Sequence, residues 1–233
     1  MSMHNDAIEA CVGREPMFKL VIGNKNYSSW SMRAWVLMRE ARIDFEEIPL
    51  KISAEVKVIG IEKYSAAGKV PVLLVNDQAI WDTLAIAETL AEFFPAKRLW
   101  PNSPRVRQLA RSACAEMHSG FQNLRGRMPM NIRASLPGRG MNVDVQRDID
   151  RIVALWRSCR QTRDESGDML FGHFTVTDAF FAPVVMRFNT YAVNLPDDAL
   201  DYVASINRLS SVQEWIAAAK LETDFVAGDE RYA

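Results

Sequence analysis

The segment Lys69-Val70-Pro71-Val72-Leu73 constrains the fold more than any other part of this chain. A proline that opens an apolar strand removes an N–H donor, so it fits poorly inside a central ladder. X-Pro bonds adopt the cis form far more readily than other peptide bonds, which makes Val70-Pro71 a candidate cis peptide. We expect the Val70 backbone to face outward, where an extended peptide-like ligand can pair with it as an added strand.

A second informative segment, Trp81-Asp82-Thr83-Leu84-Ala85-Ile86, follows eight residues after the first. It turns into a helix at Asp82-Thr83. The free N–H groups at the start of a helix, together with the positive end of its dipole, favour a bound carboxylate. The two segments together predict a site for a small acidic peptide.

Hydrophobic periodicity divides the chain into a mixed first part and a helical second part. It predicts strands at 18–22, 45–50, 71–75 and 79–81, and helices from about 31 to 41 and over 83–94. Every later element reads as helix, over about 105–128, 143–164, 175–191, 197–207 and 210–220. This order predicts a thioredoxin-like α/β N-terminal domain followed by an all-α C-terminal domain. The predicted boundaries are a disordered extension at 1–16, the first domain at 17–95, a linker at 96–104 and the helical domain at 105–233.

Composition narrows the possible partners. A net charge of −1 over 233 residues gives no argument for nucleic acid or for an anionic membrane. No apolar run approaches the roughly 18 residues that span a bilayer, so we expect no membrane insertion. The three cysteines and three histidines lack metal-ligand spacing, and we expect no metal site. Unpaired cysteines favour a reducing cytoplasm.

The loop between the first strand and the first helix carries Ser28, Ser29 and Ser31. Redox proteins with a thioredoxin-like fold have Cys-x-x-Cys here, and the pattern Ser28-x-x-Ser31 excludes disulfide exchange through the chain's own cysteines. Each serine is a candidate N-cap for the helix. Alternatively, a hydroxyl at this position can stabilise an anion near the helix N-terminus. Both interpretations stay open at this point.

Taken together, these motifs resemble the glutathione S-transferase superfamily. The resemblance rests on Val70-Pro71, on Asp82-Thr83 before Leu-Ala-Ile, and on the Ser28 to Arg33 run, and it covers nearly the whole chain beyond residue 17. The serine run is similar to the corresponding run of the serine-type zeta and tau classes. The chain thus resembles a zeta/tau-like bacterial member of the superfamily. Two departures stand out: relatives carry Glu-Ser or Gln-Ser in place of Asp82-Thr83, and Trp30 replaces a zeta-class cysteine.

The resemblance implies a glutathione site in the first domain. Val70 would pair its backbone with the cysteinyl unit, while Asp82 and Thr83 would hold the γ-glutamyl end. Lys69 would contact the glycyl carboxylate, or would be an ordinary solvated lysine. Ser28 would donate a hydrogen bond to the glutathione thiolate, and Ser29 is the alternative donor.

The helix expected over 105–128 places Arg111, His118 and Arg125 on one polar face. If this face lines the cleft above Ser28, then together with Trp30 it would form an acceptor site for an acidic or electron-rich substrate. The alternative is a solvated basic face. Arg33 is expected to brace its helix through a buried ion pair, and Thr175-Val-Thr-Asp178 is expected to form a capping box that serves stability.

The function implied is that of a cytoplasmic, homodimeric glutathione transferase active in detoxification. It would stabilise the thiolate of glutathione, its co-substrate, and conjugate it to a small electrophile without a metal. The alternatives are a non-catalytic glutathione-binding or regulatory protein on the same fold, and a glutathione-dependent isomerase or peroxidase.

Overall fold

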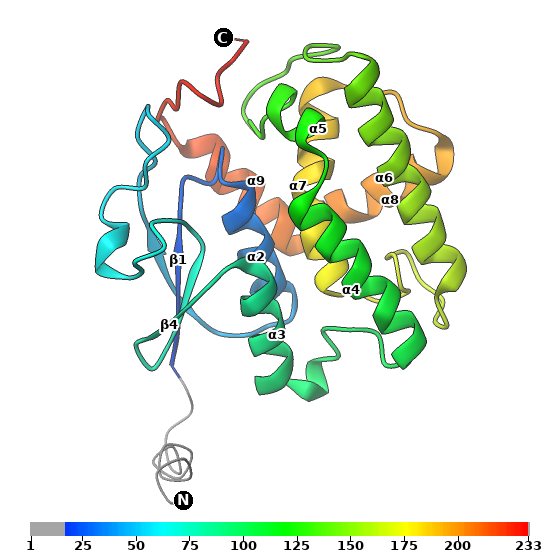
Figure 1. Ribbon diagram of the computed structural model, residues 1–233, viewed down its shortest axis with the longest axis horizontal. Helices are drawn as coiled ribbons and strands as arrows, with labels where there is room; N and C mark the ends of the chain where they lie inside the picture. The colour runs from blue at the N-terminus through cyan, green and yellow to red at the C-terminus, as the bar shows by residue number, and fades with distance from the viewer. Residues whose placement is uncertain (1–16, 233) are drawn as a thin grey trace, which may run out of the picture.

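The computed structural model describes residues 17–232, so the extension expected at 1–16 lies outside the described residues. The first part is a four-stranded mixed sheet, in the order β2-β1-β3-β4 (Figure 1). Its strands are β1 (Phe18–Ile22), β2 (Glu46–Pro49), β3 (Val72–Val75) and β4 (Gln78–Trp81). β1 runs parallel to β2, and β3 runs antiparallel to both β1 and β4. This is the expected thioredoxin-like arrangement.

Pro71 lies immediately before β3. All four β3 residues are buried, and the strand pairs with β1 on one side and β4 on the other. The proline therefore stands outside the ladder and removes no hydrogen bond from it. The expected cis peptide bond between Val70 and Pro71 is confirmed.

Helix α2 (Ser29–Glu40) joins the two parts of the molecule. It begins two residues earlier than its apolar pattern indicates, because Ser28 caps it. Residues 31–38 of this helix are all buried, since it packs against α3 (Thr83–Phe93) as well as α7 (Val176–Tyr191) and α9 (Ser210–Leu221). The large apolar core consequently runs through the sheet domain and the helices, while a smaller cluster of Val21, Ile61, Val72 and Leu74 lies apart from it in the sheet domain.

The remaining helices surround α7 (Figure 1). They are α4 (Pro104–Ser119), α5 (Gln122–Arg127), α6 (Val143–Thr162) and α8 (Asp197–Arg208), with short 3₁₀ turns at Ile61–Lys63 and Pro95–Lys97. Fifteen residues of α7 are buried, so it forms the centre of the helical region. The expected capping box is present: the Thr175 amide donates to Asp178 Oδ2 at 2.9 Å.

The single helix expected over 105–128 is wrong: the chain breaks between α4 and α5. Gly120 adopts an extended backbone and Phe121 a left-handed one, with φ of 59°. A Cβ at residue 120 would lie 2.7 Å from the Glu116 carbonyl oxygen, so this approach requires glycine. The apolar stripe continues through the break, with Phe121 and Leu124 buried in the core. Periodicity alone therefore missed the interruption.

None of the helices in residues 17–232 has the length and apolarity to cross a membrane. Cys114 and Cys159 are buried free thiols, as expected. Burial raises the pKa of the Cys159 thiol to about 12 and that of Cys114 still further, so neither is a reactive thiolate.

Candidate functional site

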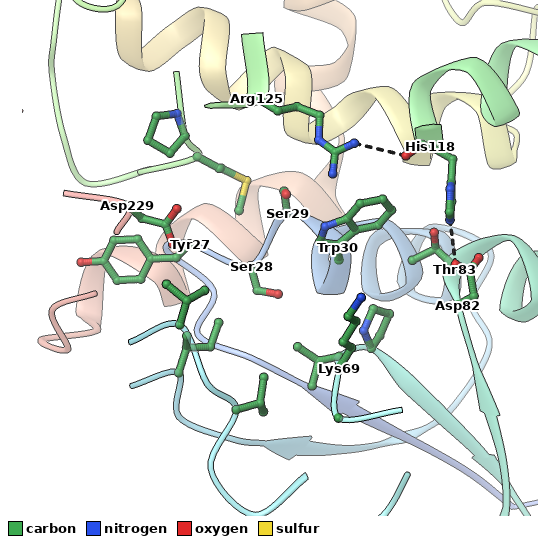
Figure 2. Close-up of a pocket in the computed structure, with 18 of the residues that line it drawn as sticks. Tyr27, Ser28, Ser29, Trp30, Lys69, Asp82, Thr83, His118, Arg125 and Asp229 are labelled. Atoms are coloured by element: carbon green, nitrogen blue, oxygen red, sulfur yellow. Dashed lines mark hydrogen bonds and ion pairs between the residues drawn. The ribbon is translucent and has the colours of Figure 1, made fainter. Parts of the chain in front are cut away.

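A cleft of about 860 Å³ opens between the sheet domain and the helices (Figure 2). One wall comes from the loop before α2, the loop before β3 and the start of α3. The opposite wall comes from α4, α5, α7 and the C-terminal segment. Most of the predicted site residues line this cleft, namely Ser28, Ser29, Trp30, Lys69, Val70, Asp82, Thr83, His118 and Arg125.

Ser28 both caps α2 and lines the cleft. Its Oγ accepts a hydrogen bond from the Ser31 amide at 3.3 Å and lies 2.8 Å from Ser31 Oγ. Ser31 Oγ accepts a further hydrogen bond from the Gly23 amide at 3.0 Å. Ser31 is fully buried, whereas Ser28 keeps 7% of its surface exposed toward the cleft. The capping interpretation is confirmed for Ser28, and its hydroxyl is still accessible from the cleft.

Ser29 occupies the first position of α2, and its hydroxyl points to the other side of the cleft. Figure 2 shows the Ser28 hydroxyl turned toward the side of Lys69 and the Ser29 hydroxyl turned toward the side of Arg125. Ser29 Oγ accepts a hydrogen bond from Arg187 Nη2 at 3.3 Å. The two candidate serines therefore face different halves of the cleft.

The loop before β3 offers an unpaired backbone. Among residues 17–232, the amide and carbonyl of Val70 have no backbone hydrogen-bond partner, although the residue is partly buried and lines the cleft. Lys69 beside it is exposed, and it also lines the cleft. Free backbone groups at a cleft wall can pair with an extended ligand.

The start of α3 carries the acidic-hydroxyl pair. Asp82, in a left-handed conformation with φ of 75°, caps the helix through Oδ1, which accepts from the Leu84 amide at 2.8 Å. Its other oxygen, Oδ2, lies 2.7 Å from His118 Nε2. Thr83 is buried, yet its hydroxyl has no hydrogen-bond partner among the described residues. A buried hydroxyl without a partner is uncommon and points to a missing polar ligand.

Trp30 lies beside the two other predicted acceptor residues that line the cleft, His118 and Arg125. Its ring stacks between two guanidinium groups, Arg33 at 4.3 Å and Arg125 at 4.7 Å from the ring centroid. The His118 ring meets its edge at a centroid distance of 5.0 Å. Arg111, in contrast, is not brought to the cleft: it points toward α3 and pairs with Glu88 at 3.0 Å.

Arg33 is buried, but the expected ion pair is wrong. Its guanidinium lies between the rings of Trp30 and Phe180, and Nη2 donates to the Met117 carbonyl at 3.4 Å. Nε and Nη1 have no partner among residues 17–232. Burial, followed by repulsion from Arg125, lowers the pKa of Arg33 to about 9.

Two cleft residues were missed by the sequence reasoning, Arg187 and Asp229. Arg187 is the one charged residue in the apolar run that follows Asp178 in α7, which was a usable signal. It is buried, and burial lowers its pKa to about 10. Asp229 belongs to the C-terminal segment, where no periodicity marks it. Burial raises its pKa to about 6.

The C-terminal segment fixes the loop that carries Ser28. The Glu222 carboxylate accepts hydrogen bonds from the amides of Lys25 and Asn26, at 2.6 and 2.9 Å. The Tyr27 hydroxyl donates to Glu230 at 2.6 Å, and burial is the main cause that raises its pKa. Tyr27 is therefore held by the tail and is unsuited to activate a thiol.

Residues 27–92 match the family of glutathione S-transferase N-terminal domains. This part of the chain is therefore similar to the N-terminal domain of glutathione S-transferases.

Individual proteins support this assignment. The chain is 28% identical over 196 residues to a Caenorhabditis elegans protein described as a probable maleylacetoacetate isomerase, covering 82% of this chain and 88% of that one. A glutathione transferase homolog from Burkholderia, solved with bound glutathione, matches with a TM-score of 0.65 at 23% identity, covering 88% and 98%. A tau-class enzyme from mango, Mangifera indica, matches with a TM-score of 0.62 at 18% identity, covering 88% and 96%. The structural matches establish the fold.

Proposed function

We propose that this chain is a glutathione-dependent enzyme that binds glutathione in the cleft and holds its thiol ionised through Ser28. The observation that carries the proposal is the unpartnered, buried hydroxyl of Thr83, which lines the same cleft as Ser28. Both residues stand at the start of a helix, where a negative charge is favoured.

The cleft fits the three parts of a γ-glutamyl tripeptide. The Thr83 hydroxyl and the start of α3 suit the γ-glutamyl carboxylate, and Asp82 suits its ammonium group. The free amide and carbonyl of Val70 suit the backbone of the cysteinyl unit. Lys69 suits the glycyl carboxylate. These assignments explain why polar groups stay unpaired at this wall of the cleft.

Bound glutathione supplies a cysteine thiol, whose thiolate is the nucleophile. Ser28 then acts as a hydrogen-bond donor that stabilises the negative charge on sulfur and lowers the thiol pKa. Ser31 orients that donor: fully buried and hydrogen-bonded to the Gly23 amide, it can give its own proton only to Ser28 Oγ among its present partners. This arrangement leaves the Ser28 proton free to point into the cleft.

The reaction that follows is conjugation to a small electrophile, as in detoxifying transferases. The relative described as a probable maleylacetoacetate isomerase favours isomerisation as the second candidate. Trp30 argues against it, because this position carries the cysteine of the zeta-class motif. A peroxidase or a non-catalytic glutathione-binding protein would use the same cleft. A cytoplasmic homodimer without a metal stays a prediction.

The ultraviolet difference spectrum of glutathione added to the protein at neutral pH tests the proposal. A thiolate band is expected. Binding of glutathione by calorimetry without such a band would favour a binding protein. Absence of binding would refute the proposed site.

A further inference from the structure

The acceptor side of the cleft carries two arginines without a carboxylate partner. Within residues 17–232, Arg125 and Arg187 form no ion pair, and both line the cleft. Many other arginines of the chain are paired: Arg151 forms two hydrogen bonds with Glu116, and Arg157 forms two with Asp198. Other described arginines without an ion pair, such as Arg107 and Arg163, donate to backbone carbonyls outside the cleft.

Both arginines are fixed in position and keep free donors. Arg187 Nε donates to the Met128 carbonyl at 2.9 Å and Nη1 to the Pro183 carbonyl at 3.1 Å, while Nη2 reaches Ser29. Arg125 Nη1 donates to the His118 carbonyl at 3.1 Å. Its Nε and Nη2 have no partner in the described part of the chain.

Burial makes the two charges costly without a ligand. Arg187 is almost fully buried and Arg125 about half buried, and the positive charge of Arg125 adds to burial in lowering the pKa of Arg187. Removing water from a cation raises its free energy, and a like charge nearby raises it further. An anion placed between the two groups would lower both costs.

The carboxylates that line the cleft do not fill this role. Asp82 is engaged with His118 and the Leu84 amide at the start of α3. Asp229 lies near enough for its charge to act on Arg187, yet the two form no ion pair among the described residues, and the Asp229 carboxylate would oppose an incoming anion. The Ser29 hydroxyl, which faces the same half of the cleft as Arg125, adds a neutral donor (Figure 2).

We propose that the acceptor substrate carries a carboxylate, or a comparably compact anionic group, which binds between Arg125 and Arg187 beside Ser29. The inference rests on the proposed glutathione site, because it places the electrophile on the far side of the thiol from Lys69 and Thr83. The substrate class is thus an electrophile that carries an acidic group.

Calorimetry with two S-substituted glutathiones tests this inference without relying on turnover. S-(4-carboxybenzyl)glutathione places a carboxylate on the acceptor side, and S-benzylglutathione is its uncharged match. The carboxylate compound should bind the unmodified protein about 10-fold more tightly, as expected for a charge-assisted hydrogen bond in a partly buried site. Arg125→Gln should reduce this preference to less than about 3-fold, and Arg125→Lys should retain part of it.

Arg151→Gln is the charge-matched control, since Arg151 pairs with Glu116 outside the cleft, and it should keep the full preference. Equal binding of the two compounds by the unmodified protein would overturn the inference and leave the glutathione site intact. A preference unchanged in Arg125→Gln, with native stability, would also overturn it. Failure of both compounds to bind would refute the glutathione site and the anionic acceptor together.

Discussion

The hydroxyl oxygens of Ser28 and Ser31 lie 2.8 Å apart, and the Ser31 oxygen also accepts a hydrogen bond from the Gly23 amide. One proton is shared between the two oxygens. If Ser28 donated it, the buried Ser31 proton would have no acceptor among these partners, a loss of about 1–3 kcal/mol. In the reverse direction Ser31 donates to Ser28 Oγ, and the Ser28 proton turns toward the cleft, where a ligand can accept it. Hydrogen bonds in series polarise one another, so the bonds from Gly23 to Ser31 and from Ser31 to Ser28 make the Ser28 hydroxyl a stronger donor.

Ser31→Ala should raise the pKa of the bound glutathione thiol by about 1 unit, because the Ser28 proton is no longer directed at the sulfur. Glutathione affinity measured by calorimetry should change less than about 3-fold. Ser112→Ala is the control, since its hydroxyl bonds only within its own helix. An unchanged thiol pKa in Ser31→Ala would show that Ser28 needs no such partner.

Thr83→Val should weaken glutathione binding about 10- to 150-fold without destabilising the free protein. The Thr83 hydroxyl has no partner in the described part of the chain, so removing it breaks no intramolecular hydrogen bond. A lost hydrogen bond to a carboxylate is worth about 1.5–3 kcal/mol. Calorimetry and urea unfolding measure the two effects separately. Normal affinity, or a stability loss above about 1 kcal/mol, would contradict the assignment.

Tyr27→Phe should leave the bound thiol pKa and the turnover nearly unchanged and lower stability by about 1–2 kcal/mol. The Tyr27 hydroxyl donates to Glu230 and accepts from Arg133 Nη2 at 2.7 Å. Its loss therefore weakens the attachment of the C-terminal segment. Thermal unfolding and steady-state kinetics test this. A large fall in kcat with a raised thiol pKa would indicate a tyrosine-based mechanism.

Asp229→Asn should stabilise the protein more at pH 7.5 than at pH 4.0, by about 1–2 kcal/mol. Burial raises the pKa of Asp229 from 3.8 to about 6, so between these values the folded chain holds a proton that the unfolded chain has released. Stability contributed by this group is present below about pH 4 and falls as the pH rises through about 6. The full shift corresponds to about 3 kcal/mol, which we halve because the carboxylate is partly solvated. Urea unfolding at both pH values measures the difference, and an equal gain at each pH would contradict it.

The side of the cleft that we propose for glutathione was predictable because its signals are local. Val70-Pro71 and Asp82-Thr83 are short motifs whose backbone geometry follows from residue type, and Ser28 is a recognisable cap. The same holds for the capping box at Thr175. Strand and helix positions follow from apolar periodicity, which burial in a single core enforces.

The acceptor side was only partly predictable because it depends on tertiary packing. Arg187 lines the cleft although it belongs to a buried helix. Arg111 lies outside the cleft because it pairs with Glu88 on α3. The break at Gly120 was hidden since the apolar stripe continues past it. The Arg33 guanidinium packs between aromatic rings, whereas an ion pair with a carboxylate was expected. The sequence pattern does not distinguish these two environments.

The pKa of the glutathione thiol bound to Ser28→Ala, followed through its thiolate absorbance as pH is varied, tests the proposed role of this residue most directly. We predict that the bound thiol pKa rises by about 1–2 units relative to the unmodified protein, with glutathione affinity retained within about 3-fold. Ser29→Ala, measured in parallel, should leave that pKa within about 0.3 units. An unchanged thiol pKa in Ser28→Ala, or a rise in Ser29→Ala alone, would contradict Ser28 as the hydrogen-bond donor to the thiolate.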